Sequence, residues 1–142
     1  MTPERRQLVL ETWQALEPQA GLAARHFYER LFELDPQARD LFAATDMARQ
    51  EAKLMDMLGL LVRTLDDEER FVRELADLGR RHAGYGARHR DYDSVGTALL
   101  WTLERTLGPR FTPEARDAWA EAYRLIAGVM RRAGAKRSGA VS

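Results

Sequence analysis

The chain has 142 residues, carries 22 basic and 22 acidic side chains, and contains no cysteine. This length predicts one domain that buries roughly two-thirds of the surface its unfolded chain exposes. The balanced charge favours no nucleic-acid partner, and the lack of cysteine excludes disulfides, thiolate nucleophiles and sulfur-ligated metals. Any chemistry must therefore rest on histidine, tyrosine and carboxylates.

The N-terminal segment MTPERRQLVLETW is charged throughout. It has no long apolar run after its arginines, so it is typical neither of a signal peptide nor of a membrane span. We therefore expect a cytoplasmic protein with no membrane partner.

The first part of the chain predicts two helices and a short helical turn. A Thr-Pro-Glu start favours a first helix that runs to about residue 16. A second helix over residues 19–34 places six side chains in one broad sector: Ala24, Phe27, Tyr28, Leu31, Phe32 and Leu34. His26 falls on the other side with charged neighbours, so we expect it to face solvent. Asp35 and Pro36 begin a short helical turn that ends near Phe42.

A long helix over residues 46–65 carries a polar residue within its apolar face. Seven side chains share that face: Met47, Gln50, Leu54, Met57, Leu58, Leu61 and Leu65. A glutamine that faces the core costs roughly 1–3 kcal/mol if its amide finds no partner. Gln50 should therefore bond to an interior group or line a cavity.

The stretch FVRELADLGRRHAGY, residues 71–85, delivers a histidine to an apolar helical face. At about 100° per residue, four of its side chains fall within roughly 40° of one another: Phe71, Leu75, Leu78 and His82. Acidic residues at 66–69 suit the positive end of this helix, and glycines at 84 and 86 should end it. A lone histidine on such a face is more often a hydrogen-bonded core residue than a metal ligand.

The last third of the chain predicts two more helices. We expect a loop over residues 84–93 that exposes His89, and then a helix over residues 92–107 that includes Val95, Leu99 and Leu103. The final helix should run from the cap at Thr112 to about residue 132. The domain would then span residues 1–132, and residues 133–142 would form a flexible C-terminal tail. No strand pattern is present, so the sequence predicts an all-α domain of six long helices and one short helix.

Three isolated polar side chains share this otherwise apolar interior. His82 and Gln50 lie on buried helical faces, and Tyr28 lies beside two phenylalanines of the second helix. A flat and largely apolar metallocycle, with its metal bound by one imidazole, would satisfy His82. Such a group would leave Gln50 and Tyr28 facing the open coordination position.

Short motifs along the chain follow the order found in globins: Phe27-Tyr28, Asp35-Pro36, Leu41-Phe42, Gln50 with Lys53-Leu54-Met55, Arg81-His82 and Val95-Gly96. With these motifs the chain resembles the single-domain bacterial globins. The stretch LGRRHAGYG with VGTALLWTLERTLGPRFTPEARDAWAEAY is similar to the second half of neuroglobin. The resemblance covers nearly all of residues 3–131 and includes the haem domain of flavohaemoglobins. It implies a globin fold around a pocket for haem b.

The resemblance also implies a role for each pocket residue. His82 matches the proximal ligand of the haem iron, Tyr28 and Gln50 match the distal ligand-binding pair, and Leu54 matches the aliphatic residue over the iron. Lys53 matches a basic residue that pairs with a haem propionate, and Arg81 is a weaker candidate for the same edge. The other implied haem contacts are Phe42, Leu78, Val95 and Leu99.

The distal pair predicts tight oxygen binding. Oxygen gains negative charge on ferrous iron, so a hydroxyl from Tyr28 and an amide N–H from Gln50 would stabilise it. If each hydrogen bond contributes about 1–1.5 kcal/mol, the two together raise the affinity on the order of a hundredfold and slow the release of oxygen. Because an amide is a poor iron ligand, we expect a five-coordinate ferrous iron and an open or water-bound ferric iron.

The chain departs from the flavohaemoglobin pattern on the proximal side. In those proteins a tyrosine and a glutamate back the proximal histidine and make it more basic. Tyr92 matches the tyrosine, but residues 130–134 contain no acid. We therefore expect a weaker proximal effect and no strong peroxidase-like activity.

Three classes of function fit these expectations. The first is reversible binding of oxygen, with NO and CO as further ligands, for storage, delivery or scavenging. The second is an enzyme, a nitric oxide dioxygenase or nitrite reductase. It would need a separate reductase, because the chain has no glycine-rich phosphate fingerprint. The third is gas sensing or helix-bundle interaction without catalysis.

Overall fold

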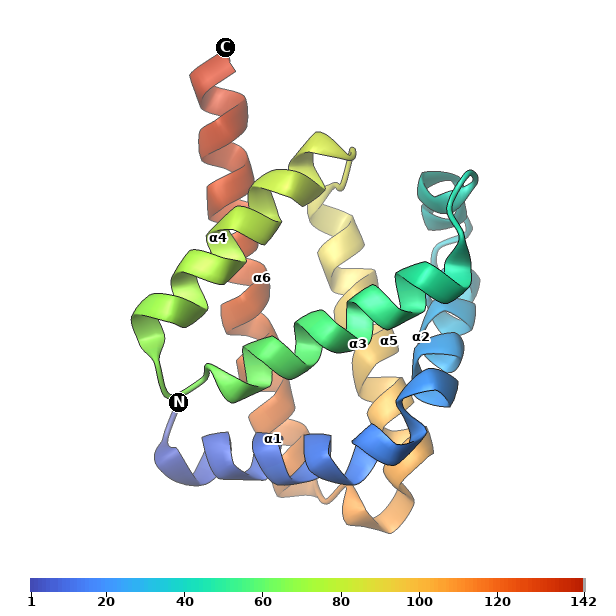
Figure 1. Cartoon of the computed structure of the whole chain (residues 1–142), viewed down its shortest axis with the longest axis vertical. Helices are drawn as coiled ribbons and strands as arrows, with labels where there is room; N and C mark the ends of the chain where they lie inside the picture. Colours follow the sequence, from blue (N-terminus) through green and yellow to red (C-terminus); the bar gives the residue numbers. More distant parts are fainter. Residues whose placement is uncertain (142) are drawn as a thin grey trace.

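The computed structural model describes residues 1–141, except for the side chains of His89 and of residues 136–141. Within that part of the chain it shows six α-helices and three short 3₁₀ helices, with no strand (Figure 1). In order they are α1 (Pro3–Leu16), η1 (Glu17–Gln19), α2 (Ala20–Leu34), η2 (Pro36–Phe42), α3 (Met47–Arg63), α4 (Glu68–Gly84), α5 (His89–Leu107), η3 (Gly108–Arg110) and α6 (Pro113–Val141). The predicted all-α architecture is confirmed. None of the described helices is long and apolar enough to cross a membrane.

Short polar side chains set where several helices begin. The Thr2 hydroxyl accepts a hydrogen bond from the backbone N–H of Arg5 at 3.1 Å. Asp46 and Asp67 act in the same way at the starts of α3 and α4. Each cap satisfies an N–H that has no partner within its own helix, and a cap of this kind is worth about 1 kcal/mol. These caps fix the first turns of the two helices that carry Gln50 and His82.

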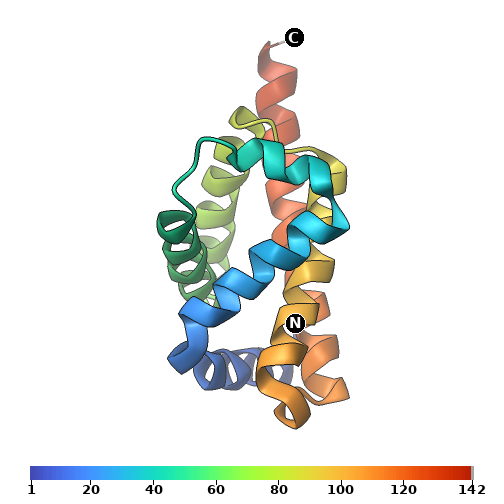
Figure 2. The same cartoon turned by 90° about the vertical axis from the view of Figure 1, so that its right-hand side faces the viewer.

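The helices pack in crossed pairs. α4 lies along α6, α2 crosses α5, and α1 packs across α6 (Figures 1 and 2). α3 and α4 diverge from their connection at residues 64–67, and they are not among the helix pairs in close backbone contact. The first turn of α3 and the last turn of α4 therefore lie at the wide end of this arrangement.

A glycine sets the distance between α4 and α6. A Cβ atom added to Gly79 would lie 2.5 Å from the carbonyl oxygen and 2.6 Å from the Cα of Met130. No side chain fits there, so the two backbones touch. This contact fixes the helix that carries His82 against the longest helix of the fold.

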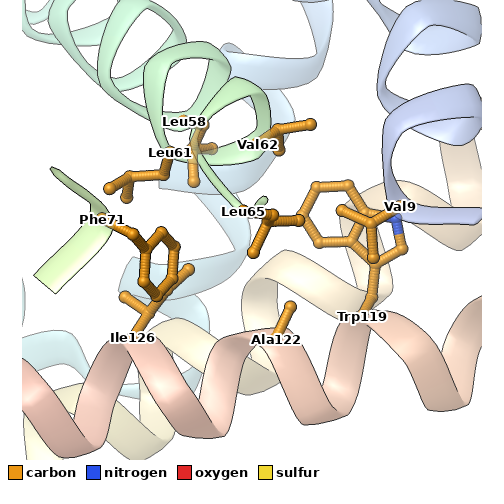
Figure 3. Close-up of a pocket in the computed structure, with 9 residues that line it drawn as sticks. All are labelled: Val9, Leu58, Leu61, Val62, Leu65, Phe71, Trp119, Ala122 and Ile126. Atoms are coloured by element: carbon orange, nitrogen blue, oxygen red, sulfur yellow. The ribbon is translucent and has the colours of Figure 1, made fainter. Parts of the chain in front are cut away.

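The core consists of a larger and a smaller apolar cluster. The larger joins α1, α2, α5 and α6 and includes Trp13, Phe27, Leu103 and Trp119. The smaller lies between α4 and α6 and includes Phe71, Leu75, Ile126 and Met130, together with Leu61 of α3. Where α1, α3 and α6 meet, apolar side chains leave a cavity of about 10 Å³ (Figure 3). A void of this size has room for about one water molecule, so it is a packing defect and not a cofactor site.

Two helix boundaries differ from the sequence-based expectation. α5 begins at His89, three residues before the expected start, because the Asp91 carboxylate accepts a hydrogen bond from the backbone N–H of Arg88 at 2.6 Å. The loop expected over residues 84–93 is therefore shorter, and the His89 side chain lies outside the described part of the chain. Gly86 has a φ of 91°, which agrees with the predicted end of the preceding helix.

α6 continues to Val141, beyond the expected end near residue 132. Ala133 and Gly134 are buried, and a Cβ on Gly134 would lie 3.1 Å from the Cβ of Ala83, so this part of α6 packs against α4. Helical backbone does not by itself measure flexibility, and Ser142 lies outside the described residues. The flexible tail over residues 133–142 therefore stays a prediction.

Candidate functional site

His82 lies in the last turn of α4, where the helix itself orients its ring. Its Nδ1 is 2.9 Å from the carbonyl oxygen of Leu78, one turn earlier. A carbonyl can only accept, so Nδ1 carries the proton and Nε2 keeps its lone pair. Among the described residues, Nε2 has no hydrogen-bond partner. This is the tautomer of histidine that can bind a metal through Nε2.

The surroundings of His82 favour the neutral imidazole. Burial lowers its pKa below the ordinary value of 6.5, and the nearby charge of Arg81 lowers it further. The hydrogen bond to Leu78 acts in the opposite direction but does not outweigh burial. At neutral pH the ring is therefore uncharged, as metal ligation requires.

Gln50 and Tyr28 are joined although 22 residues separate them in the chain. The Gln50 amide in α3 donates a hydrogen bond of 3.1 Å to the Tyr28 hydroxyl in α2. The interior partner expected for Gln50 is therefore the tyrosine oxygen. Tyr28 is only 5% exposed. Its hydroxyl accepts from Gln50, so its own hydrogen is left to donate to a third group.

The Tyr28 hydroxyl keeps its proton at neutral pH. Burial raises the pKa of this group above its ordinary value, and the charge of Glu51 raises it further. The hydrogen bond from Gln50 lowers the pKa but does not cancel the effect of burial. Tyr28 is therefore a neutral donor in an apolar environment.

Aromatic rings fix the direction of Tyr28. The ring centroids of Phe27, Phe42 and Phe32 lie 5.0, 5.5 and 6.0 Å from that of Tyr28. Phe27 and Phe42 meet it edge to face, an arrangement that ring quadrupoles favour. Phe42 comes from η2, so this short helix closes one side of the group around Tyr28.

The remaining predicted contacts divide into apolar and charged residues. Leu54, Val95 and Leu99 belong with Phe42 and Tyr28 to the larger apolar cluster, and Leu78 packs against the smaller one. Lys53 is exposed and forms no ion pair among the described residues. Arg81 is also exposed, but its guanidinium lies 3.5 Å from the Asp77 carboxylate. Of the two basic candidates, Lys53 is therefore the one whose charge is not already paired with a carboxylate of the described residues.

Tyr92 and His82 do not form a direct pair. Among the described residues, no hydrogen bond joins them. The Tyr92 carbonyl accepts from the Tyr123 hydroxyl at 2.6 Å, and the guanidinium of Arg131 lies over the Tyr92 ring at 5.2 Å. The segment of residues 130–134, which contains no acid, therefore places the cation of Arg131 beside Tyr92.

His26 also differs from its expected environment. Its side chain is 23% exposed, and its Nδ1 lies 3.8 Å from the Glu29 carboxylate. The expectation that it faces solvent was therefore wrong in degree, because the residue is half-buried. It takes no part in the group around Tyr28.

A charged cluster beside η2 was not predicted from the sequence. Arg88, next to the start of α5, contacts Asp35 and Gln37, which lie about 50 residues earlier, and it is also paired with Asp91. The available signal was the spacing of three residues between Arg88 and Asp91, which is that of a capping box. Arginine is not a usual N-cap residue, so this spacing did not stand out.

Comparison with known proteins identifies the family of the chain. The family model described as Globin matches residues 25–130. Neuroglobin of Danio rerio is 29% identical, and the alignment covers 91% of this chain and 89% of that protein. Neuroglobin of Tetraodon nigroviridis is 28% identical, with 96% of this chain and 94% of that protein covered.

A flavohemoprotein of Rhizobium meliloti (strain 1021) is 27% identical over 92% of this chain, but the match spans 33% of that protein. The six-helix architecture agrees with the globin fold that the sequence motifs implied. Since the family model covers most of the chain, the protein belongs to the globin family, whose members bind haem and, through it, oxygen.

Proposed function

We propose that this globin binds oxygen reversibly at the iron of a haem b held by His82, with Tyr28 and Gln50 as hydrogen-bond donors to the bound ligand. The observation that carries the proposal is the Gln50–Tyr28 hydrogen bond, because it leaves the phenol hydrogen free in an apolar environment. When bound, the haem supplies a ferrous iron at which oxygen, NO or CO binds.

The described residues fit a haem in their chemistry. His82 Nε2 is a metal-binding nitrogen without a protein partner. Phe42, Leu54, Leu78, Val95 and Leu99 are the apolar contacts that a largely apolar macrocycle needs. Lys53 is the stronger candidate to pair with a propionate, because Arg81 already lies beside Asp77.

On the proximal side, the hydrogen bond from His82 to Leu78 does two things. It holds the proton on Nδ1, which leaves the Nε2 lone pair for the iron, and it limits rotation of the ring. Such a second partner typically raises the basicity of a histidine ligand and fixes its orientation. Among the side chains that the structure describes, no carboxylate joins this hydrogen bond, so the effect on the iron should be moderate.

On the distal side, Tyr28 and Gln50 act as a donor pair for a ligand that carries partial negative charge. Tyr28 donates its hydroxyl hydrogen, and Gln50 has a second amide hydrogen beside the one given to Tyr28. Two bonds of about 1–1.5 kcal/mol each would raise the affinity on the order of a hundredfold. The pair contains no imidazole, so we expect a five-coordinate ferrous iron, high affinity and slow release.

Absorption spectroscopy tests this proposal directly. The 142-residue chain is mixed with haem, and spectra are recorded in the ferric form, after reduction with dithionite, and after addition of oxygen. We expect one haem per chain and a stable oxygen-bound spectrum in the parent, and loss of both in His82→Ala. A parent that takes up no haem, or a His82→Ala variant with unchanged spectra, would overturn the assignment.

The similarity to a flavohemoprotein favours nitric oxide dioxygenation or nitrite reduction as a second candidate function. The matched part is a third of that protein. Repeated turnover would need a reductase that returns the ferric iron to the ferrous state. A single-turnover reaction of the oxygen-loaded protein with NO measures its intrinsic capacity. Each conversion of NO to nitrate leaves the iron ferric, so repeated turnover with an added electron donor would favour the enzyme, and a single turnover that leaves ferric protein would favour the carrier.

A further inference from the structure

Two segments that lie far apart in the sequence meet beside the candidate site. The Arg88 guanidinium, next to the start of α5, lies 3.7 Å from the Asp35 carboxylate and donates to the Gln37 side-chain oxygen at 3.3 Å. Arg90 donates to the same Gln37 oxygen. A few residues away, the Leu41 side chain lies 3.8 Å from the position that a Cβ on Gly86 would take. Polar contacts therefore connect Asp35 and η2 to the α4–α5 turn, and Leu41 lies near Gly86 of the same turn.

Asp91, three residues along the chain, holds the Arg88 guanidinium in the orientation that contacts Asp35 and Gln37. Asp91, only 8% exposed, accepts from the Arg88 Nη2 at 2.9 Å and from its Nε at 3.2 Å, and it also accepts from the Arg88 backbone N–H. Such a two-pronged bond fixes the plane of a guanidinium more firmly than a single contact would. Because the bond to Asp91 already restricts the Arg88 side chain, its contact with η2 costs little additional conformational entropy.

The charge state of Asp91 supports this arrangement. Burial raises the pKa of the carboxyl, but the hydrogen bonds and charge of Arg88 outweigh burial and leave the pKa below its ordinary value. Asp91 is therefore an anion at neutral pH. Its negative charge therefore persists to a lower pH than that of an unpaired aspartate.

The two connected segments belong to opposite parts of the site. η2 ends in Phe42, whose ring packs on Tyr28, the proposed distal donor. The turn on the other side follows the end of α4 at Gly84, in the same helical turn as His82, the proposed proximal ligand. A link between these segments therefore limits how far the proximal and distal parts can move apart at this edge.

We propose that Arg88 is a positioning residue that holds η2 against the α4–α5 turn and so slows the opening of the haem site at this edge. The statement about haem rests on the proposed function, whereas the link between the two segments does not. Arg88 acts through the segments that it joins and needs no contact with the cofactor.

Amide hydrogen exchange of the full chain tests the link itself. In Arg88→Ala, we expect exchange in residues 35–42 to rise about threefold or more, although the substitution lies about 50 residues away. Exchange in residues 3–16 should not change, and this separates a local effect from general destabilisation. Arg116→Ala, which removes an exposed ion pair to Glu104 at 3.4 Å, is the matched control and should leave residues 35–42 unchanged. Unchanged exchange of residues 35–42 in Arg88→Ala would overturn the proposal.

Loss of haem to an excess of a scavenging apoglobin tests the consequence. We expect haem loss several-fold faster in Arg88→Ala, an intermediate rate in Gln37→Ala, and partial rescue in Arg88→Lys, which keeps the charge but not the two-pronged geometry. If exchange rises while haem loss does not change, the effect on haem is refuted. If the parent takes up no haem, the proposed function fails, and the exchange measurement still decides whether Arg88 links the two segments.

Discussion

The proximal and distal halves of the candidate site are held in different ways. His82 lies on a helix whose backbone touches α6 at Gly79, a contact that leaves no space for even one methyl group. Tyr28 and Gln50 are held by a hydrogen bond between their side chains and by contacts of the tyrosine with neighbouring aromatic rings, not by the backbone. The helix with the proposed metal ligand is therefore fixed by a backbone contact, whereas the distal pair is fixed by side chains. We expect substitutions on the distal side to change ligand affinity without moving the helices.

The largest expected effect comes from breaking the backbone contact on the proximal side. Gly79→Ala would place a methyl group 2.5 Å from the Met130 carbonyl oxygen. We expect a loss of about 3 kcal/mol in the free energy of unfolding, near the upper end for overpacking a rigid site. Urea unfolding followed by circular dichroism measures this loss.

Gly21→Ala is the matched control for that substitution, because a Cβ at this helical position meets nothing within 4 Å. We expect it to be neutral or to stabilise the protein by about 0.5 kcal/mol. If the two alanine variants unfolded at the same urea concentration, the close approach of α4 and α6 would not have the importance assigned to it.

The next effect concerns the distal pair. Tyr28→Phe removes the proposed donor but keeps the ring and its aromatic contacts. We expect oxygen release about tenfold faster, which corresponds to the loss of roughly 1.4 kcal/mol of hydrogen bonding. Stopped-flow displacement of oxygen by CO measures the rate. Gln50→Leu should act in the same direction, and Gln14→Leu on the exposed face of α1 should not change the rate.

A smaller effect is expected from pH. The pKa of His82 lies below 6.5 in the folded protein, mainly because of burial, so the unfolded chain binds this proton more readily. The contribution of this group to stability is complete above the unfolded pKa and is lost as the pH falls below about 6.5 and through the folded pKa. Unfolding of the haem-free protein at pH 7.5 and 5.5 should show a larger decrease for the parent than for His82→Asn. Equal decreases would contradict the lowered pKa.

The smallest expected effect separates the two basic residues at the proposed haem edge. Lys53→Gln should speed haem loss by about twofold, as expected for one exposed ion pair. Arg81→Gln should change the rate less, because Arg81 lies beside Asp77 already. The comparison is most informative at low ionic strength, where exposed charges are least screened. A larger effect at Arg81 would reverse the assignment.

The sequence was sufficient to predict features that depend on local chemistry. Thr2 and Thr112 cap the first and the last helix as expected, and Gly86 takes the left-handed conformation that was expected where α4 ends. The apolar spacing around Gln50 predicted that its amide needs an interior partner. The all-α architecture follows from such local rules, because α1, α3, α4 and α6 begin at a capping side chain and the helices carry apolar faces.

Features that depend on how helices cross could not be predicted in the same way. The spacing around Gln50 cannot name Tyr28 as its partner, because their contact depends on where α2 passes α3. In the sequence, nothing distinguishes Gly79 from other helical glycines, because its contact with the Met130 backbone depends on how α4 and α6 pack. The early start of α5 depends on Asp91 and Arg88, and arginine is not a residue that marks a helix start.

The hydrogen bond between Gln50 and Tyr28 has a consequence for how their substitutions combine. A hydroxyl that accepts one hydrogen bond is polarised and becomes a better donor in the next, so bonds in a chain reinforce one another. Removal of Gln50 would then weaken the donation from Tyr28 as well. The two free-energy losses should therefore sum to more than the loss in the double variant, and a double-mutant cycle would measure their coupling energy. Oxygen affinity in this globin would then be a property of the pair, and not the sum of two independent contacts.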